Sequence, residues 1–322
     1  MLTIWTNAQF SDAPRALLVE GTKAHRLIFS TQLSASNLAK AAPDPALRET
    51  DVAFGQPDPE LALQCPRLRW VHLTTAGYAR YDGAEFRAGF GGRGAMLTSS
   101  SQVYAEPCAE HVLAFMMAHA RQLPLSLDHQ RTSRDWPHLP VRASSRLLVG
   151  QKVVMLGFGA IGRRLAELLG PFGMNITAVR RKPAGDENVR VVTEDQLDAA
   201  LAAADHVVNL LPENPATRGF VSAPRFGAMK AGAIFYNVGR GTTVQQEALL
   251  AALRSGRLAA AYLDVTDPEP LPPEHPLWTA PNCFITPHTA GGHDAESERL
   301  VRHFLANLER FCSGAELSDR VI

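Results

Sequence analysis

The chain has 322 residues, of which 46% are hydrophobic and 20% are charged, a composition typical of globular proteins. Its 32 lysines and arginines balance its 32 aspartates and glutamates, so no overall basic field favours binding to nucleic acid or to an anionic membrane. A chain of this length exceeds most single hydrophobic cores, and we therefore expect two domains.

The sequence also argues against membrane, secreted and metal-binding classes. No apolar stretch approaches the roughly 20 residues that span a bilayer, and the N-terminus lacks the charged and apolar regions of a signal peptide. The histidines show no H-E-x-x-H or other ligand spacing, so we expect no metal. The scattered cysteines fit a reducing cytoplasm better than a disulfide framework or a zinc site; they are Cys65, Cys108, Cys283 and Cys312.

The first half of the chain alternates short apolar runs with helical patterns. The runs at 26–30, 51–55, 68–73 and 95–98 predict strands of a first parallel sheet. A long helix is expected from Ser101 to about Ala120. The stretch 122–150 holds Pro124, Pro137 and Pro140 and has little periodicity, so a loop or arm is expected there.

The second half repeats the alternation. Strands of a second sheet are expected at 152–156, 174–179, 206–211, 233–238, 260–264 and 283–286. Helices are expected between them, for example at 244–254, and a last one from about Ala295 to Phe311. Alternating strands and helices predict an α/β protein with two doubly wound parallel-sheet domains.

A glycine-rich motif stands at the start of this second half. Gly157-Phe158-Gly159-Ala160-Ile161-Gly162 follows the apolar run 152–156 and opens a helical pattern over 163–169. This strand, turn and helix order is the one that binds a dinucleotide pyrophosphate, with glycines allowing a tight turn and close backbone approach. An ordinary turn between strand and helix is the alternative, and we predict dinucleotide binding.

The cofactor class depends on the end of the strand predicted at 174–179. An acidic residue about 20 residues past the glycines would hold the ribose of NAD, but the chain has Arg180, Arg181 and Lys182. Guanidinium groups pair with a 2′-phosphate. A solvated basic turn is the alternative; we predict that NADP(H) is preferred and that NAD(H) is possible.

Three further polar residues follow the last predicted strands. Arg240, Glu269 and His288 come after the strands at 233–238, 260–264 and 283–286, respectively. In an open α/β sheet, ligands collect at the carboxyl ends of the strands, so the three could face one crevice. Each alone has an ordinary explanation as a surface turn, a solvated loop residue or a helix-cap neighbour.

These motifs give the chain its resemblance to a known family. GFGAIG at 157–162, VRR at 179–181, NVGRG at 237–241, DVTDPEP at 264–270 and TPHTAGG at 286–292 resemble the D-isomer-specific 2-hydroxyacid dehydrogenases. The NADPH-dependent glyoxylate/hydroxypyruvate reductase branch is the nearest in pattern. The resemblance implies a flavodoxin-like substrate domain at 1–100 plus 290–322, a Rossmann NADP-binding domain at 101–289, and an interdomain cleft.

The resemblance also implies roles for the three polar residues. Arg240 would bind and polarise the carbonyl of a small 2-oxoacid, and His288 would donate a proton as general acid. Glu269 would orient His288 and favour its charged form. The product would be a D-2-hydroxyacid.

Other residues are carried over on the same resemblance. Thr75, Ala76 and Gly77 would bind the substrate carboxylate through backbone N–H groups, together with Arg240 and His288. Besides the glycine motif and Arg180–Arg181, the implied cofactor residues are Leu211, Pro212, Thr217, Val238, Gly239 and Asp264. Asp264 takes the family's position beside the nicotinamide amide.

The arm at 122–150 is where the resemblance places the surface of a homodimer. Trp136 in this arm would reach the neighbouring subunit's pocket and limit substrate size; packing within the arm is the equal alternative. Two other functions stay open: an NAD-dependent D-lactate-type dehydrogenase, and a non-catalytic nucleotide-sensing binding protein with this fold.

Overall fold

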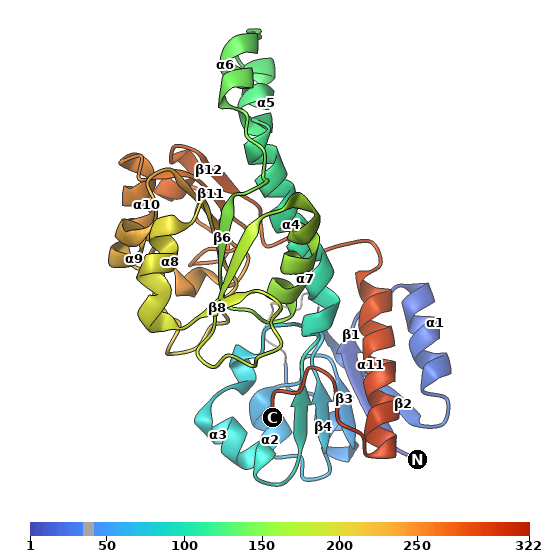
Figure 1. Ribbon diagram of the computed structural model, residues 1–322. Helices are drawn as coiled ribbons and strands as arrows, with labels where there is room; N and C mark the ends of the chain where they lie inside the picture. Colours follow the sequence, from blue (N-terminus) through green and yellow to red (C-terminus); the bar gives the residue numbers. More distant parts are fainter. Residues whose placement is uncertain (35–41) are drawn as a thin grey trace. The chain divides into compact units, whose positions relative to one another are not determined.

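Two parallel sheets organise the chain in the computed structural model, which describes residues 1–34 and 42–322 (Figure 1). The chain divides into two units, one of Met1–Tyr104 with Gly292–Ile322 and the other of Ala105–Gly291. Every strand pair within the sheets is parallel, with strand order β2-β1-β3-β4-β5 in the first unit and β12-β11-β10-β9-β6-β7-β8 in the second. The predicted pair of doubly wound α/β sheets is confirmed.

The first unit has a sheet with a core on each face. Its strands are β1 (Thr3–Ala8), β2 (Arg26–Ser34), β3 (Val52–Phe54), β4 (Trp70–His72) and β5 (Met96–Thr98), and its helices are α1 (Asp12–Gly21), α2 (Pro59–Leu63), α3 (Ala84–Phe86) and α11 (Glu296–Ser313). Successive strand residues point to opposite faces. Ile4 and Trp70 therefore pack with α1 and α11, while Trp5 and Val71 pack with α2 and α3.

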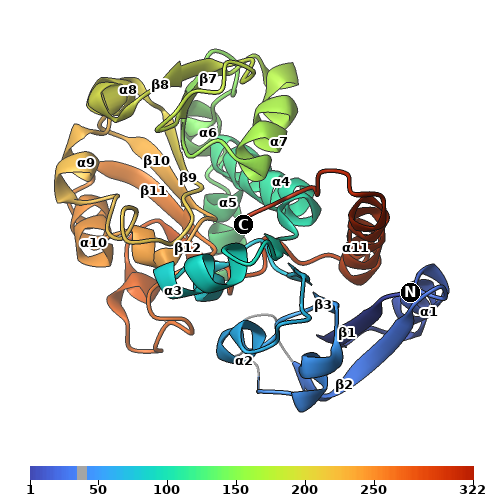
Figure 2. The same cartoon turned by 90° about the horizontal axis from the view of Figure 1, so that it is seen from below.

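The second unit carries the larger sheet. Its strands are β6 (Lys152–Leu156), β7 (Asn175–Val179), β8 (Arg190–Val192), β9 (His206–Asn209), β10 (Ala233–Asn237), β11 (Leu258–Leu263) and β12 (Cys283–Ile285). Its helices are α4 (Ser101–Ala120, which begins in the first unit), α5 (Leu123–Arg131), α6 (His138–Ser144), α7 (Ala160–Leu169), α8 (Leu197–Ala203), α9 (Ala223–Ala228) and α10 (Gln246–Arg254). Helices α8, α9 and α10 cover one face of the sheet, and α4 and α7 cover the other (Figure 2).

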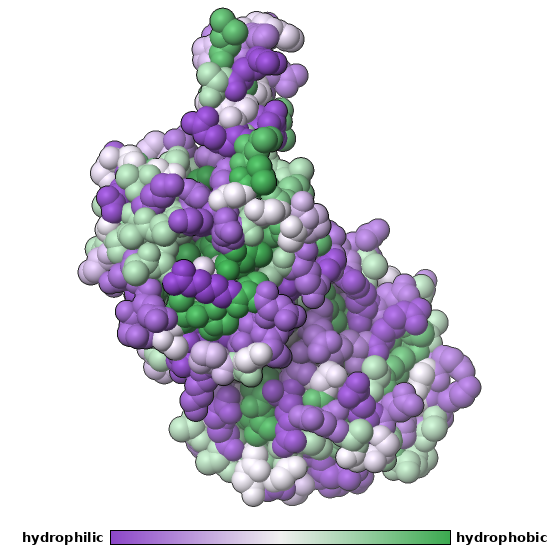
Figure 3. All heavy atoms as spheres, viewed as in Figure 1, coloured by the Kyte–Doolittle hydropathy of each residue, from purple (hydrophilic) through white to green (hydrophobic). Residues whose placement is uncertain are grey.

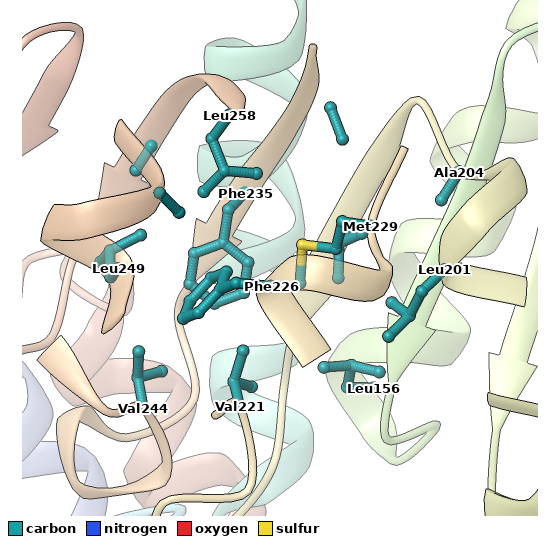
Figure 4. Packing of buried hydrophobic residues seen from close by; sticks show 14 of the residues in the cluster. Leu156, Leu201, Ala204, Val221, Phe226, Met229, Phe235, Val244, Leu249 and Leu258 are labelled. Atoms are coloured by element: carbon teal, nitrogen blue, oxygen red, sulfur yellow. The ribbon is translucent and has the colours of Figure 1, made fainter. Parts of the chain in front are cut away.

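A continuous apolar core fixes the first of these faces. Phe226 of α9 and Phe235 of β10 meet edge to face with ring centroids 5.4 Å apart, and Leu249 and Leu258 close around them (Figure 4). Met229 extends the cluster toward Leu201 and Leu156 of the neighbouring elements. Burying such side chains contributes roughly 1.5–3 kcal/mol each, so this core holds the strands whose carboxyl ends carry the predicted site.

The described structure differs from the sequence-based expectation at two strands and in the arm. Strands β1 and β8 lie outside the predicted set, and the stretch expected to be a loop or arm contains helices α5 and α6. Both helices have no buried residue and extend away from the sheet beyond the end of α4 (Figure 1). The arm is therefore largely helical, although neither of its helices packs into the core of its own unit.

A buried histidine gives the second unit a pH-dependent stability. His206 of β9 is buried, its Nδ1 lies 3.0 Å from the Tyr236 hydroxyl, and its Nε2 contacts Gln151. Burial lowers the pKa of His206 from 6.5 to about 4. Between these values the unfolded chain binds the proton and the folded chain does not, so stability falls as the pH drops through this window.

Replacing His206 with Gln should remove this part of the pH dependence. On going from pH 7.5 to 4.5, we expect the wild type to lose about 2.5 kcal/mol more unfolding free energy than His206→Gln, because at pH 4.5 the unfolded histidine is almost fully protonated while the folded one is still mostly neutral. Chemical denaturation of both proteins at the two pH values measures the difference. Equal losses in the two proteins would mean that His206 takes up its proton inside the folded unit.

Candidate active site

The glycine motif lies where the strand order of the second unit reverses, between β6 and β9. Gly157 has φ +95°, which a glycine adopts readily. A Cβ on Gly159 would meet nothing within 4 Å, whereas one on Gly162 would lie 3.1–3.3 Å from Phe158, Gly157 and Leu210. The first glycine thus makes the turn, the second leaves the backbone open to a ligand, and the third allows close packing of α7.

Helix α7 begins at Ala160 directly after this turn, and no side chain caps its N-terminus. The free N–H groups of its first turn therefore offer donors to an anion. The open face of Gly159 beside them is the space that a pyrophosphate requires. These residues fit a dinucleotide.

The loops after β10, β11 and β12 emerge at the same edge of the sheet. The register pairs Asn237 with Leu263 and Leu263 with Ile285, so the three strands end side by side. Two glycines bring the first loop close to its neighbours. A Cβ on Gly239 would lie 2.8 Å from the Leu211 oxygen, and one on Gly241 would lie 1.8 Å from the Thr266 oxygen.

Arg240 stands between these two glycines. Its carbonyl accepts hydrogen bonds from Asn237 Nδ2 at 3.3 Å and from the Thr243 hydroxyl at 2.6 Å, which fix the backbone. The side chain is half-buried, and its Nη1 donates to the Gly239 carbonyl at 2.6 Å. The positive charge of Arg240 helps to lower the pKa of Glu269, because the guanidinium stabilises the ionised form of that carboxyl group.

Glu269 and His288 form a direct pair. His288 Nδ1 lies 2.9 Å from Glu269 Oε2, and Glu269 Oε1 accepts a hydrogen bond from the backbone N–H of Thr266 at 3.0 Å. Burial raises the pKa of Glu269, but the hydrogen bonds from His288 and Thr266 and the nearby charges outweigh it, so the pKa lies below its ordinary value. A carboxylate that stays ionised can orient the imidazole ring and stabilise its charged form.

Asp264 holds the loop that carries His288. Its Oδ1 accepts from the Thr286 hydroxyl at 2.7 Å and from the Thr289 N–H at 2.8 Å, and its Oδ2 accepts from the Ala290 N–H at 3.0 Å. The backbone N–H of His288 donates to the Asp264 carbonyl. His288 has φ +53°, an unfavourable value for a residue other than glycine. The contacts of Asp264 keep the backbone in this conformation.

His111 of α4 is a part of this network that the sequence does not reveal. Its Nε2 lies 3.1 Å from Thr286 Oγ1. Because the Thr286 hydroxyl gives its single hydrogen to Asp264, it can only accept from His111. His111, considered from sequence only as a metal ligand, thus supports the His288 loop through Thr286 and Asp264. The pairing of β11 with β12 brings Asp264 and Thr286 together, but no sequence signal points to His111 of α4.

The end of β7 carries Arg180 and Arg181. Arg180 follows Val179, which pairs in register with Leu156, so it stands beside Gly157 at the glycine motif. Its Nη1 donates to Glu187 at 2.6 Å, and Arg181 is exposed. The predicted residues Pro212 and Thr217 also lie together, since the Thr217 hydroxyl donates to the Pro212 carbonyl at 2.6 Å.

Two other arginines near the glycine motif are paired with carboxylates. Arg163 Nη2 lies 2.9 Å from Asp186 Oδ1. Arg164 contacts Glu106 through Nε at 2.5 Å and Nη2 at 3.0 Å, and Glu167 through Nη1 at 2.7 Å. Both side chains therefore have protein partners on the outer side of α7.

The predicted substrate-carboxylate loop belongs to the first unit. The Thr75 hydroxyl donates to the Gly77 carbonyl at 2.7 Å and accepts from Gln56 Nε2 at 3.0 Å. Asn7 anchors Gln56 through two hydrogen bonds of 2.9 Å. Asn7 lies at the end of β1 and Gln56 follows β3, and the strand order of this sheet reverses between these two strands, so the loop of Thr75, Ala76 and Gly77 is fixed at a switch point.

The arm exposes many large apolar side chains, and Trp136 is 91% exposed. Figure 3 shows hydrophobic atoms on this projection. The exposed set in the arm is Leu123, Leu125, Leu127, Trp136, Leu139, Leu147 and Val149. An apolar surface of this kind marks an interaction site in a soluble protein. It does not support packing of Trp136 inside the arm.

Two features of the described residues bear on other functions. No helix within 1–34 and 42–322 is long and apolar enough to cross a membrane. In the same residues, no three His, Cys, Asp or Glu side chains gather as a metal site would require.

Comparison with known proteins identifies the family. Residues 113–290 match the family model described as "D-isomer specific 2-hydroxyacid dehydrogenase, NAD binding domain". The chain belongs to this family. The family expected from the sequence motifs is confirmed, and with it the enzyme class, an NAD(P)-dependent dehydrogenase.

Named relatives lie in the expected branch. The chain is 35% identical to the human glyoxylate reductase/hydroxypyruvate reductase over 198 residues, which are 61% of this chain and 60% of the human one. It is 33% identical to the glyoxylate reductase of Aeropyrum pernix over 263 residues, 80% of this chain and 77% of that one. An NADPH-dependent glyoxylate/hydroxypyruvate reductase of Sinorhizobium meliloti, solved with NADP and sulfate, superposes with a TM-score of 0.80 at 27% identity, covering 100% of this chain and 98% of that one.

Proposed function

We propose that the chain reduces small 2-oxoacids, such as glyoxylate or hydroxypyruvate, to D-2-hydroxyacids with NADPH. The observation that carries this proposal is the Glu269–His288 pair, 2.9 Å apart, at the edge of the sheet that also holds Arg240 and the glycine motif. The names of the human, Aeropyrum and Sinorhizobium relatives support the substrate class.

The side chains match what the reaction requires. A dinucleotide bound at the glycine motif would supply the hydride. Arg240 binds the carboxylate or ketone oxygen and polarises the carbonyl. His288 donates the proton to the developing alkoxide and takes it back in the reverse direction. Glu269 keeps the imidazole oriented and balances its charge.

Cofactor binding falls to the residues around the glycine motif. We assign the 2′-phosphate to Arg180 and Arg181, and the pyrophosphate to the start of α7. The backbone around Leu211, Pro212, Val238 and Gly239 would line the cofactor, with Thr217 near the adenosine and Asp264 near the nicotinamide. Asp264 would do so while holding the His288 loop, because a carboxylate has about four acceptor positions and three are used.

The two units have different proposed tasks. The unit of Met1–Tyr104 and Gly292–Ile322 binds substrate, with the backbone of Thr75, Ala76 and Gly77 as donors to its carboxylate. The unit of Ala105–Gly291 binds the cofactor and carries the catalytic side chains. The four cysteines are free, and we propose a cytoplasmic enzyme.

A rate measurement tests the function. Initial rates of NADPH and NADH oxidation are compared with glyoxylate, hydroxypyruvate, pyruvate and phenylpyruvate. Turnover that favours NADPH supports the proposal, and the ranking of the acids defines the pocket. A preference for NADH would favour the D-lactate-type alternative. Cofactor binding without turnover of any 2-oxoacid would favour a nucleotide-sensing protein.

We further propose that the arm forms a homodimer and that Trp136 limits the partner's pocket. Trp136→Ala should then raise kcat/KM for phenylpyruvate relative to glyoxylate at least about tenfold, because removing a large side chain leaves room for a bulky substituent. Kinetics with both acids measure the ratio. Leu139→Ala, another exposed apolar residue of the arm, is the control. An unchanged ratio in Trp136→Ala would contradict this role.

A further inference from the structure

The loop between β7 and β8 folds around one buried carboxylate, that of Glu187. Its side chain is only 3% exposed. Its Oε1 accepts hydrogen bonds from Arg180 Nη1 and from the Ala184 N–H, each at 2.6 Å, and its Oε2 accepts from the Gly185 N–H at 2.8 Å. Buried carboxylates occur where donors satisfy them, so these three contacts define the fold of the loop.

The contacts also fix the charge of Glu187. The backbone N–H of Ala184 lowers its pKa, burial opposes this, and the hydrogen bonds from Gly185 and Arg180 lower the pKa further, below the ordinary value. Glu187 is therefore a carboxylate at neutral pH. An ion of this kind holds a guanidinium through a charge-assisted hydrogen bond, which is stronger than a neutral one.

Glu187 does not replace the acidic residue that NAD-binding proteins carry at the end of the second strand. Arg180 occupies that position, directly after Val179, and its backbone N–H is fixed by the carbonyl of Val192 in β8. The carboxylate of Glu187 is buried and already accepts three hydrogen bonds, so it is not presented to a ribose hydroxyl. Its contact with Arg180 uses a single nitrogen, Nη1. Within residues 1–34 and 42–322 the other guanidinium N–H groups of Arg180 have no protein acceptor and can bind an oxyanion, and the side chain is 27% exposed.

We propose that Glu187 is the residue that positions Arg180 for NADPH and thereby sets the preference for NADPH over NADH. The carboxylate of Glu187 holds the guanidinium of Arg180 at Nη1 and closes the turn that follows Arg181 and Lys182. The basic side chains are therefore already ordered when the 2′-phosphate binds. Pre-ordering of a flexible side chain increases affinity by removing its entropic cost. This inference rests on the proposed use of NADPH through Arg180.

The chain offers a matched control on the same loop. Asp186 is the neighbouring residue and also pairs with an arginine, Arg163, at 2.9 Å, but its side chain is 66% exposed. Asp186→Asn makes the same change of charge as Glu187→Gln, one residue away. An effect of general loop charge on the cofactor would appear in both variants, whereas positioning of Arg180 would appear only in Glu187→Gln.

The experiment is to measure Kd for NADPH and for NADH by fluorescence titration of the full chain and of Glu187→Gln, Glu187→Asp, Asp186→Asn and Arg180→Asp. We expect Glu187→Gln to raise the Kd for NADPH about tenfold, the size of losing a charge-assisted hydrogen bond, and that for NADH less than about twofold. Glu187→Asp, which keeps the charge but shortens the side chain, should raise the Kd for NADPH by less. Asp186→Asn should leave both constants within about twofold.

Several results would overturn the inference. These are an unchanged ratio of the two constants in Glu187→Gln, equal weakening of both cofactors, or tighter NADPH binding because a negative charge has gone. If Glu187→Gln fails to fold, the ratio of the Kd values for NADPH and NADH in Glu187→Asp tests the inference in its place. A preference lost in Arg180→Asp but kept in the Glu187 variants overturns this inference alone. A wild type without NADPH preference overturns the proposed cofactor as well.

Discussion

Replacing His288 should lower kcat for 2-oxoacid reduction about 10³-fold, within the range attributed to a general acid, while the Kd for NADPH changes less than about twofold. The reason lies in the geometry: the imidazole is held by Glu269 at 2.9 Å, at the edge of the sheet where the substrate carbonyl is proposed to lie. Stopped-flow or steady-state kinetics with cofactor titration measure the two quantities separately.

The choice of variant matters because His288 has φ +53°. Histidine and asparagine occur at left-handed positions more often than alanine, so a loss in His288→Ala could come from a displaced loop. Asn tolerates this conformation better, and Gln retains an N–H that can bond to Glu269. Similar losses of kcat in His288→Asn, His288→Gln and His288→Ala would identify the missing proton donor as the cause. Equal losses of kcat and cofactor affinity would contradict the general-acid role.

Glu269 adds a pH test to the same experiment. Its pKa is lower than the ordinary value of 4.5, so the folded enzyme keeps the Glu269 carboxylate at pH values where the unfolded chain has protonated it. The stabilisation that this ion supplies is complete above pH 4.5 and is lost as the pH falls below that value. A Glu269→Gln variant should lack this acid-side loss of stability.

The sequence predicted the strands of the second unit that end at the proposed site, but it missed β1 inside the first sheet and β8 at the edge of the second. Apolar runs such as 153–156, in which every residue is buried, have a clear pattern. Strand β8 has only three residues, Arg190–Val192, and exists because β7 pairs with it at the sheet edge. So short a segment has no periodicity of its own, which is why it escaped prediction.

The arm shows a different reason for a missed element. Helices α5 and α6 bury no residue, so the apolar periodicity by which a helix is found in a sequence is missing. The prolines that suggested a loop stand in the first turn of each helix, Pro124 in α5 and Pro140 in α6. Proline is tolerated there because the first-turn N–H groups have no partner in the helix.

For the proposed site, sequence motifs could suggest candidate residues but not how those residues are held. The Glu269–His288 contact joins positions 19 residues apart, and the network of Asp264, Thr286 and His111 joins three elements. Such contacts depend on strand register, which one-dimensional patterns do not define. The same holds for Glu187, whose importance appears only once its burial against Arg180 is known.

The close approach of two loops leads to the second large expected effect. In Gly241→Ala, the new Cβ would lie 1.8 Å from the Thr266 oxygen and 2.0 Å from its carbonyl carbon, so one of the two loops must move. We expect a loss of about 1–3 kcal/mol of stability, as for other overpacked sites. Because a misplacement of about 1 Å in an active site can cost 10²-fold in rate, we expect kcat to fall about that much.

Gly241→Ala should act on catalysis because both loops carry site residues. Arg240 precedes Gly241, and the Thr266 N–H anchors Glu269 Oε1 at 3.0 Å, so a shift of either loop separates the guanidinium from the Glu269–His288 pair. Gly227→Ala is the matched control, since its Cβ would meet nothing within 4 Å, its φ is not positive and it lies inside helix α9, where Ala is favourable. Thermal unfolding and kcat, measured on both variants, separate an effect on stability from an effect on catalysis. If Gly241→Ala lost stability but kept kcat, the contact would support the fold alone, and the positions of Arg240 and Glu269 would have to be set by other contacts.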